Sequence, residues 1–293
     1  MAVTKVRPAK DRRKVTYRNF IIFTIVVLAC GWVGQALNNA TNSPSEESLG
    51  MLLWLVAPLI ASILLRGFAG DGWHDTGIKP LLRGNIKWYI LSLLVFPVLT
   101  LAVIFTGNLL GWISLTGFNT SLYLQTFALA LLPNFFKNIP EEFVWRGYLT
   151  PKLVSLKIND YILYLIVGLI WGLWHLPYYL YFLDSSTIQN FTSLGLEVFI
   201  PLTILATIAW TVVFVEIWFL TKSIWPAVLL HMVEDAFINP LVLDGSFQIA
   251  GGKDILIHPV VGIFSIVLFT AVGLGLRRIR VKAWQAEQAL PQF

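Results

Sequence analysis

The chain has 293 residues, of which 57% are hydrophobic and 13% charged, with a formal net charge of +5. A soluble domain carries about 25% charged and about 45–50% apolar residues, so this composition excludes an ordinary soluble domain and indicates a lipid bilayer as partner. The positive charge does not indicate nucleic acid, because lysine and arginine lie between long apolar stretches. A single cysteine, Cys30, excludes a disulfide framework.

Eight apolar stretches are long enough to cross a hydrocarbon core of about 30 Å, which needs roughly 20 residues per helix. They are residues 19–38, 50–66, 87–112, 126–156, 160–182, 194–221, 223–241 and 258–277. The fourth contains Asn138 and Pro140, which predict a kink or a break. The sequence therefore predicts an all-α polytopic membrane protein with about eight transmembrane helices in a single membrane domain, residues 19–277.

Basic residues in the first 18 positions precede the first stretch, as in a signal peptide, but no small-residue cleavage site follows, which predicts a retained helix. The segments on the same side are basic, with Arg66, Lys79, Arg83, Lys87, Lys152, Lys157, Lys222, Arg277, Arg278, Arg280 and Lys282. The opposite loops hold Lys253 and the acids Glu46, Glu47, Asp184, Asp244 and Asp254. Basic loops stay in the cytoplasm. Segment 1–18 and tail 278–293 are therefore predicted to be cytoplasmic, in a cell membrane or an endoplasmic reticulum membrane.

Ionisable side chains inside a span cost several kcal/mol unless they are paired or hydrated, so each is a candidate functional residue. The fourth stretch contains Glu141, Glu142 and Arg146. Glu142 and Arg146 are four residues apart and can pair on one helix face, whereas Glu141 points about 100° away. The spacing predicts one carboxylate held by the arginine and a second, Glu141, that is free to exchange a proton.

Two further polar groups occur in later spans. His175 follows Trp171 by one turn in the fifth stretch, and His231 precedes Asp235 by one turn in the seventh. At about 1.5 Å per residue, these groups and Glu141 lie at overlapping depths inside the bilayer. The three groups are therefore expected to meet in one polar cavity.

Such a cavity suits general-base activation of water and stabilisation of an oxyanion. Glu141 would take a proton from a water molecule that His175 orients. His231 and Asp235 would face the oxygen that gains negative charge, although Asp235 could donate to it only if protonated. Alternatively, Asp235 fixes the tautomer of His231.

Along the chain these residues form the motifs Glu-Glu-x-x-x-Arg, aromatic-x-x-x-His and His-x-x-x-Asp. Three such motifs on successive spans resemble the CPBP family, the CAAX-type prenyl endopeptidases and their bacterial relatives, the intramembrane glutamic proteases. The resemblance implies a metal-independent, cofactor-free endopeptidase whose catalytic positions are Glu141, Glu142, Arg146, His175, His231 and Asp235. Glu141 and His175 would activate water, and His231 and Asp235 would lie on the oxyanion side.

Two positions depart from the usual pattern of that family: Trp171 stands where phenylalanine is usual, and Asp235 where asparagine is common. The resemblance implies a membrane-associated peptide or a lipidated, for instance prenylated, C-terminal protein segment as substrate. A cytoplasmic basic rim of Arg83, Lys152 and Lys157 could bind an acidic C-terminus, or could follow from topology alone.

Other interpretations remain open. Three residues are candidates for lining a cavity or contacting a substrate: Trp145, Trp171 and Glu216. The alternative for each is a packing role, which is favoured for Glu216. The polar groups could also serve solely to hold the helices together, without a catalytic role. The chain could be a non-catalytic binding or immunity protein of the same fold, or a proton-coupled transporter that uses Glu141, Glu216 and His231 as a relay. A zinc protease is disfavoured, because no His-Glu-x-x-His motif occurs.

Overall fold

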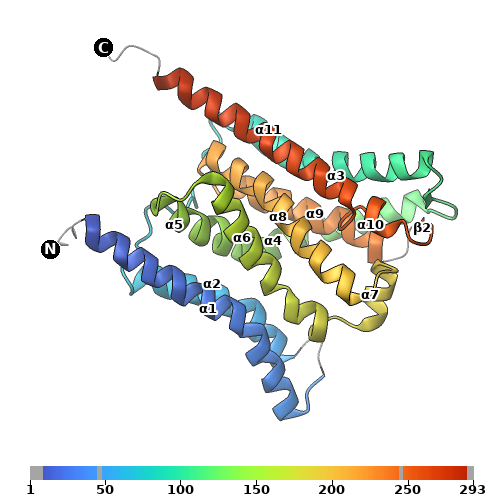
Figure 1. Cartoon of the computed structure of the whole chain (residues 1–293), viewed down its shortest axis with the longest axis horizontal. Coiled ribbons are helices and arrows are strands. Elements are labelled where there is room, and N and C mark those ends of the chain that lie inside the picture. Colours follow the sequence, from blue (N-terminus) through green and yellow to red (C-terminus); the bar gives the residue numbers. More distant parts are fainter. Residues whose placement is uncertain (1–8, 45–47, 244–246, 289–293) are drawn as a thin grey trace.

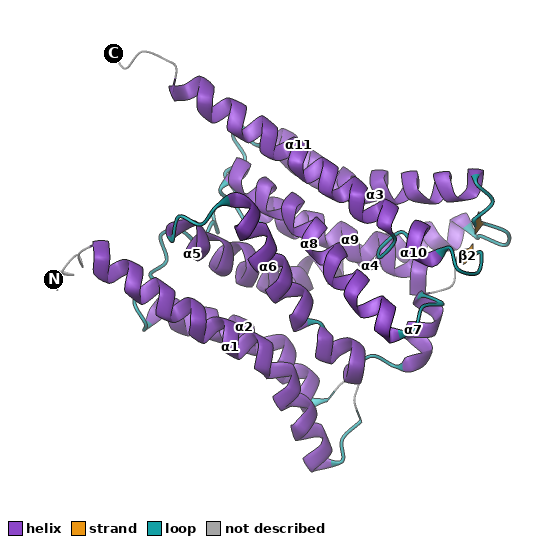
Figure 2. Cartoon of the chain, in the orientation of Figure 1, coloured by secondary structure: helices purple, strands orange, loops and turns teal. Residues whose placement is uncertain are grey.

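The computed structural model describes residues 9–44, 48–243 and 247–288. Outside these residues lie parts of the two predicted terminal segments, residues 1–8 and 289–293, and three of the predicted outer acids, Glu46, Glu47 and Asp244. Helices make up most of the described chain, so the all-α prediction is confirmed (Figure 2). The only strands in the described part form one short antiparallel ladder, in which Ile113 pairs with Ile249.

The elements follow one another as helices joined mostly by short loops. In chain order they are α1 (Ala9–Thr41), α2 (Leu49–Gly67), α3 (Ile86–Leu109), β1 (Ile113–Ser114), α4 (Thr120–Val144), η1 (Trp145–Leu149), α5 (Thr150–Ser155), α6 (Asp160–Trp174), η2 (Tyr178–Phe182), α7 (Ser185–Phe191), α8 (Leu196–Thr221), α9 (Trp225–Leu243), β2 (Gln248–Ile249), α10 (Asp254–Ile257) and α11 (Ile263–Gln288). The segments η1 and η2 are π-helical turns.

Five helical segments of the described chain are long and apolar enough to cross a membrane. They are Asp11–Thr41, Leu49–Gly67, Ile86–Leu109, Asp160–Phe182 and Leu196–Thr221. These match the first, second, third, fifth and sixth predicted spans. Helices also occupy the other three predicted positions, α4, α9 and α11, but each carries ionisable residues along its length. The chain is therefore a multi-pass membrane protein, and two of its more polar helices, α4 and α9, carry candidate site residues.

The helices form an elongated bundle in which α1 and α2 pair on one side, and α3 and α11 lie on the opposite side (Figure 1). Between them, α4 packs against α9, and α6 against α8. Both ends of the drawn chain emerge at the same end of the bundle (Figure 1). The helices that carry the predicted motifs, α4, α6 and α9, are thus central in the bundle.

Glycines allow close helix crossings at two places. A Cβ atom on Gly34 of α1 would meet the backbone of Gly50 of α2. A Cβ on Gly168 of α6 would lie 2.6 Å from the Cα of Ile208 in α8. Small residues let membrane helices approach closely, because dispersion contacts rather than hydrophobic exclusion drive their association in lipid. The close approach of α6 to α8 fixes the helix that ends at His175.

Helix α4 runs without a break through Asn138 and Pro140, so the predicted break is not found there. The irregular turn begins a few residues later, at η1. In this turn the amide of Thr150 donates to the carbonyl of Trp145, five residues earlier. Single π-turns inside helices are frequent at functional sites, because they shift the side chains on either side of the turn. Here the turn directly follows Glu141 and Glu142.

A mostly buried polar group beside the C-terminal end of η1 consists of Arg66, Asp71, Asp75, Tyr148 and Lys152, and we call it the Asp75 cluster. Asp75 accepts from Arg66 Nη1 at 2.6 Å and from Lys152 Nζ at 2.8 Å. Tyr148 Oη donates to Asp71 Oδ2 at 2.7 Å. These bonds hold the connection between α2 and α3 against η1 and α5.

One further bond ties this cluster to η1. Arg66 Nη2 donates to the carbonyl oxygen of Gly147. In an α-helix that oxygen would accept from the residue four positions later, but this residue is Pro151, which has no N–H. The carbonyl of Gly147 is therefore available to the arginine.

The cluster also changes one expectation and sets the charge of Asp75. Lys152 is only 3% exposed and is bonded to Asp75, so it is not free to bind a substrate C-terminus as part of a basic rim. Burial by itself would raise the pKa of the Asp75 carboxyl, but the bond and charge of Lys152 and the charge of Arg66 outweigh burial and lower it.

Candidate active site

A cavity of about 390 Å³ lies among α2, α4, α6, α8 and α9. Its ionisable lining residues are Lys137, Glu141, His175, His231, Glu234 and Asp235, and its other walls are largely aromatic and aliphatic. The candidate residues Glu141, His175, His231 and Asp235, which come from three helices, therefore line one cavity. An apolar pocket with a few convergent polar groups is the usual form of a ligand or active site.

Glu141 is fixed in the cavity wall by two tryptophans. Its Oε1 accepts from Trp171 Nε1 at 3.0 Å and from Trp145 Nε1 at 3.2 Å. The same oxygen lies 4.0 Å from His231 Nε2. Trp145 and Trp171 were candidate cavity walls from the sequence, and the structure adds that both indoles hold the Glu141 carboxylate.

Glu142 is fully buried and binds two partners. Its Oε1 accepts from Arg146 Nη1 at 2.9 Å, as the four-residue spacing predicts, and lies 2.8 Å from His231 Nδ1. The Arg146 guanidinium also lies over the rings of Trp171 and Phe214, at 4.4 and 4.1 Å from their centroids. Because a carboxylate accepts, Nδ1 of His231 carries a proton; Nε2 is an acceptor when the ring is neutral and a donor when the ring is charged.

His175 ends α6 and has the same tautomer. Its Nδ1 lies 2.9 Å from the carbonyl oxygen of Trp171. A carbonyl oxygen only accepts, so Nδ1 carries the proton, and Nε2 of the neutral imidazole is free to accept. His175 can therefore accept a hydrogen bond from a water molecule in the cavity.

Asp235 has three hydrogen-bond partners that were not candidate residues: Asn239 Nδ2 donates to its Oδ1 at 3.4 Å, and two donors bind its other oxygen. Its Oδ2 accepts from Asn138 Nδ2 at 2.7 Å and from Lys137 Nζ at 2.9 Å. Both donors lie in α4, in the region where a break was expected. The available signal was Lys137 itself, a charged residue inside a span and one turn before Glu141.

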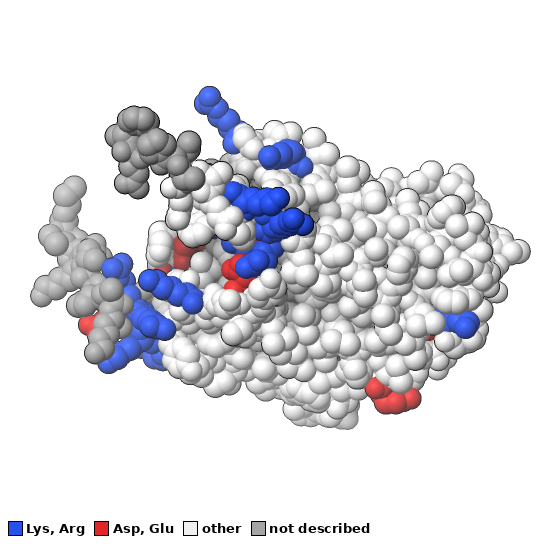
Figure 3. Space-filling model, turned by 45° about the horizontal axis from the view of Figure 1, so that its top comes forward, with Lys and Arg blue, Asp and Glu red and all other residues white. Residues whose placement is uncertain are grey.

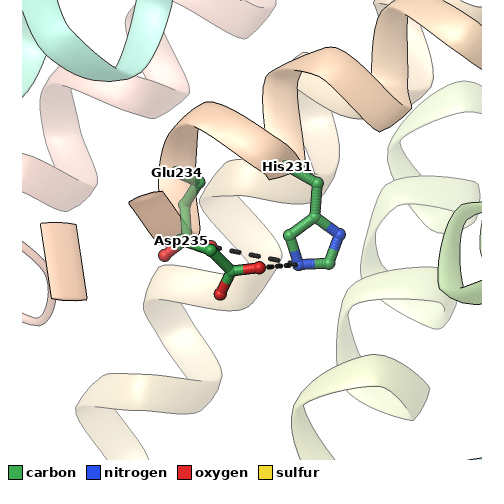
Figure 4. A group of neighbouring side chains, drawn as sticks. All are labelled: His231, Glu234 and Asp235. Carbon is green, nitrogen blue, oxygen red and sulfur yellow. Dashed lines mark ion pairs between the residues drawn. The ribbon is translucent and has the colours of Figure 1, made fainter. Parts of the chain in front are cut away.

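Glu234 is the third acid near His231. The Nε2 of His231 lies 3.9 Å from Glu234 Oε2 and 3.9 Å from Asp235 Oδ2 (Figure 4). These three residues offer ligand atoms within 4.8 Å of one another and could hold a metal ion. However, Oδ2 of Asp235 is already bonded to an amide and to an ammonium group. The positive charge beside that oxygen in this structure is Lys137.

Glu216 lies outside this cavity, which corrects its candidate role in the cavity lining. Its carboxylate is fully buried and accepts from Arg280 Nε at 2.7 Å, from Arg280 Nη2 at 2.8 Å and from Tyr164. Arg280 also donates to Asp160 at 2.7 Å. The residue joins α8 to α6 and α11, because its partners are supplied by those two helices.

A second, smaller cavity of about 170 Å³ lies between α2 and α4. Its walls are mostly apolar, and Trp145 is one of them. The two cavities share Leu55, Lys137, Glu141 and Trp174. Glu141 and Lys137 therefore lie between the larger cavity, which holds the polar groups, and this mostly apolar one.

Residues 122–237 match the family described as type II CAAX prenyl endopeptidase Rce1-like. No curated protein matches the chain. The matched residues run from α4 to α9 and contain Glu141, Glu142, Arg146, His175, His231 and Asp235, so the family match and the cavity involve the same part of the molecule. Over these residues the chain carries a domain of the Rce1-like type II CAAX prenyl endopeptidase family.

Proposed function

We propose that the chain is a membrane-embedded endopeptidase in which Glu141 activates water to hydrolyse a peptide bond. The observation that carries this proposal is the placement of Glu141, which lines the cavity while two indoles fix its carboxylate. The family match supports a substrate that is a membrane-associated peptide or a lipidated, for instance prenylated, C-terminal segment.

The hydrolysis follows from the groups in the cavity. A water molecule donates one hydrogen to Glu141 and another to Nε2 of His175. As Glu141 takes its proton, the water oxygen attacks the carbonyl carbon, and the C=O electron pair moves to the carbonyl oxygen. When this intermediate collapses, the C–N bond breaks, and the proton on Glu141 passes to the leaving nitrogen. The products are an acid and an amine, and Glu141 is regenerated.

The supporting residues act through their neighbours. Glu142 accepts from His231 and from Arg146, so it orients the imidazole at the cavity wall. Arg146 compensates the buried charge of Glu142. Both are positioning residues rather than groups that touch the substrate.

The proposal places the cavity inside the bilayer. We take α4 with η1 and α5, α9 and α11 as spans beside the five more apolar segments, which gives a single eight-helix membrane domain over residues 19–277 with both termini in the cytoplasm. In support, lysine and arginine side chains gather toward one end of the molecule, and most of the remaining visible face is uncharged (Figure 3). Basic segments collect on the cytoplasmic side of membrane proteins.

The test is a peptidase assay in detergent or liposomes with a farnesylated CAAX peptide beside a mixed peptide library. We expect cleavage by the wild type to survive a chelator and to fall by at least about 10³-fold in Glu141→Ala, because the general base is lost. The matched control is Glu197→Ala, which removes an exposed carboxylate outside the cavity lining and should leave the rate unchanged.

Three results would contradict the proposal. Cleavage retained by Glu141→Ala would remove the assigned general base. Loss of cleavage in chelator would favour a metal held by His231, Glu234 and Asp235. A folded wild type that cleaves no peptide would favour a non-catalytic binding role for the cavity.

A further inference from the structure

The acids around the cavity outnumber its fixed positive charges. Glu141, Glu234 and Asp235 line it, and Lys137 is the one lysine or arginine among its described lining residues. Attack of water on a carbonyl carbon places a further negative charge on the carbonyl oxygen. Nearby carboxylates oppose that charge, so the reaction needs a donor aimed at this oxygen.

The two residues expected on the oxyanion side are already engaged with other groups. Asp235 Oδ2 accepts from both Asn138 and Lys137, and an adjacent ammonium favours the charged carboxylate, which has no proton to donate. His231 donates its Nδ1 proton to Glu142, and its Nε2 lies 3.9–4.0 Å from three carboxylates, those of Glu141, Glu234 and Asp235. A proton on Nε2 therefore faces three acids that compete with an oxyanion for it, so a further donor is needed.

Lys137 has more N–H donors than hydrogen-bond partners among the described residues. An ammonium group has three N–H bonds. Among the described residues, the hydrogen bond of Nζ goes to Asp235, at 2.9 Å. The side chain is 47% exposed and lines the cavity, so its other N–H groups are accessible to a bound molecule. Asp235 Oδ2 in turn lies 3.9 Å from His231 Nε2, which places the ammonium at the His231 end of the cavity.

We propose that Lys137 is a catalytic residue of this hydrolysis, and that its ammonium group donates a hydrogen bond to the carbonyl oxygen as that oxygen becomes negative. Asp235 is the positioning residue that holds the ammonium at the cavity wall. Lys137 keeps its proton throughout, so the path of the proton from water through Glu141 to the leaving nitrogen is unchanged. This inference rests on the proposed function.

The test compares Lys137→Met and Lys137→Arg with the wild type on the farnesylated CAAX peptide or on a library peptide that the wild type cleaves. We expect kcat of Lys137→Met to fall by about 10²–10³-fold, the usual loss when one oxyanion donor is removed. KM should change by less than about threefold, and Lys137→Arg should keep part of the rate, because it keeps a charged donor. Lys87→Met, which removes an exposed lysine at the start of α3, is the control without effect.

A second measurement tests whether Lys137 donates a hydrogen bond to the oxyanion or only neutralises the charge of Asp235. In Lys137→Met/Asp235→Asn, an amide donor replaces the acid, and kcat should recover by at least about tenfold. In Lys137→Met/Asp235→Leu, neither charge nor donor is present, and kcat should stay low. Affinity for a phosphonate analogue of the peptide, which carries a tetrahedral anion, should fall in parallel with kcat, whereas affinity for the uncleaved peptide in a Glu141→Ala background should not.

The inference is overturned if Lys137→Met keeps kcat within about threefold of the wild type. It is also overturned if the asparagine and leucine double variants recover equally, since Lys137 then only neutralises Asp235. These failures would leave Glu141-dependent cleavage intact. A wild type that cleaves no peptide would instead overturn the proposed function, and this inference with it.

Discussion

Two groups of charged side chains, the Asp75 cluster and the cavity lining, differ in how tightly their charges are paired. In the Asp75 cluster, Asp75 binds Arg66 and Lys152 at 2.6 and 2.8 Å. In the cavity, Lys137 and Asp235 pair at 2.9 Å with ammonium N–H groups left over, and His231 Nε2 lies 3.9–4.0 Å from three carboxylates, those of Glu141, Glu234 and Asp235. In closed ion pairs, at hydrogen-bond distance, the two groups satisfy each other and stabilise the fold. Open contacts, which are longer and lie beside a cavity, leave donors and acceptors that a bound molecule can use.

The two regions are joined through one turn of helix. Arg146, in η1, pairs with Glu142 beside the cavity, and the next residue, Gly147, accepts a hydrogen bond from Arg66 of the Asp75 cluster. We therefore expect substitutions in closed ion pairs mainly to lower the stability of the fold, and substitutions at open contacts of the cavity mainly to lower the cleavage rate. Three substitutions of paired residues test the effect on stability, and the Glu141 and Lys137 variants test the effect on cleavage.

The largest stability effect is expected for Arg146→Ala. The substitution leaves the fully buried carboxylate of Glu142 without its cation and removes the guanidinium from the rings of Trp171 and Phe214. The free energy of unfolding should fall by about 3–5 kcal/mol. Thermal unfolding of the purified protein in detergent measures this, with Arg83→Ala, an exposed arginine, as control. An unchanged melting temperature would contradict the pairing of Glu142.

A smaller, pH-dependent effect is expected for Asp75→Asn, about 2–3 kcal/mol at neutral pH. Since the pKa of Asp75 is lower in the folded chain than its usual value, its ion pairs stabilise the fold above about pH 4. That contribution is lost as pH falls through the folded-state pKa. The difference in unfolding free energy between wild type and variant should therefore shrink on acidification. A difference that is constant from pH 7 to pH 3 would contradict this account.

The smallest effect is expected for Glu216→Gln. The amide oxygen can still accept from Tyr164 and Arg280 Nη2, but the amide NH2 would face the Nε donor of Arg280 and the charge is lost, so the free energy of unfolding should fall by about 1–2 kcal/mol. The cleavage rate per folded molecule should not change, because Glu216 lies outside the cavity. A proton relay through Glu216 would instead predict a loss of activity, and rate measurements at equal amounts of folded protein distinguish the two.

Local spacing predicted much of the site, because a helix fixes which side chains share a face. The pairing of Glu142 with Arg146 follows from a separation of four residues, and so does the joint position of His231 and Asp235. Eight of the observed helical segments also occupy the positions of the predicted spans, because long apolar runs are readable without knowledge of tertiary packing.

The remaining features depend on contacts between distant segments. Lys137 lies 98 residues from Asp235, and Asn138 beside Pro140 suggested an interruption rather than a face shared with the site. Arg280 reaches Glu216 from 64 residues away. Such partners cannot be read from spacing along one helix, since the packing of two helices decides which of their polar residues meet.

The turn η1 has a consequence for how chains of this kind can vary in length. Glu142 and Lys152 lie on one continuous helical segment; Glu142 binds His231 at the cavity, and Lys152 binds Asp75 in the Asp75 cluster. One residue corresponds to about 100° of rotation in an α-helix, so an insertion or deletion between them would turn one end away from its partners. Homologues that keep both contacts must therefore keep this interval constant, and a gap placed within it marks an alignment error or a chain without one of the two contacts.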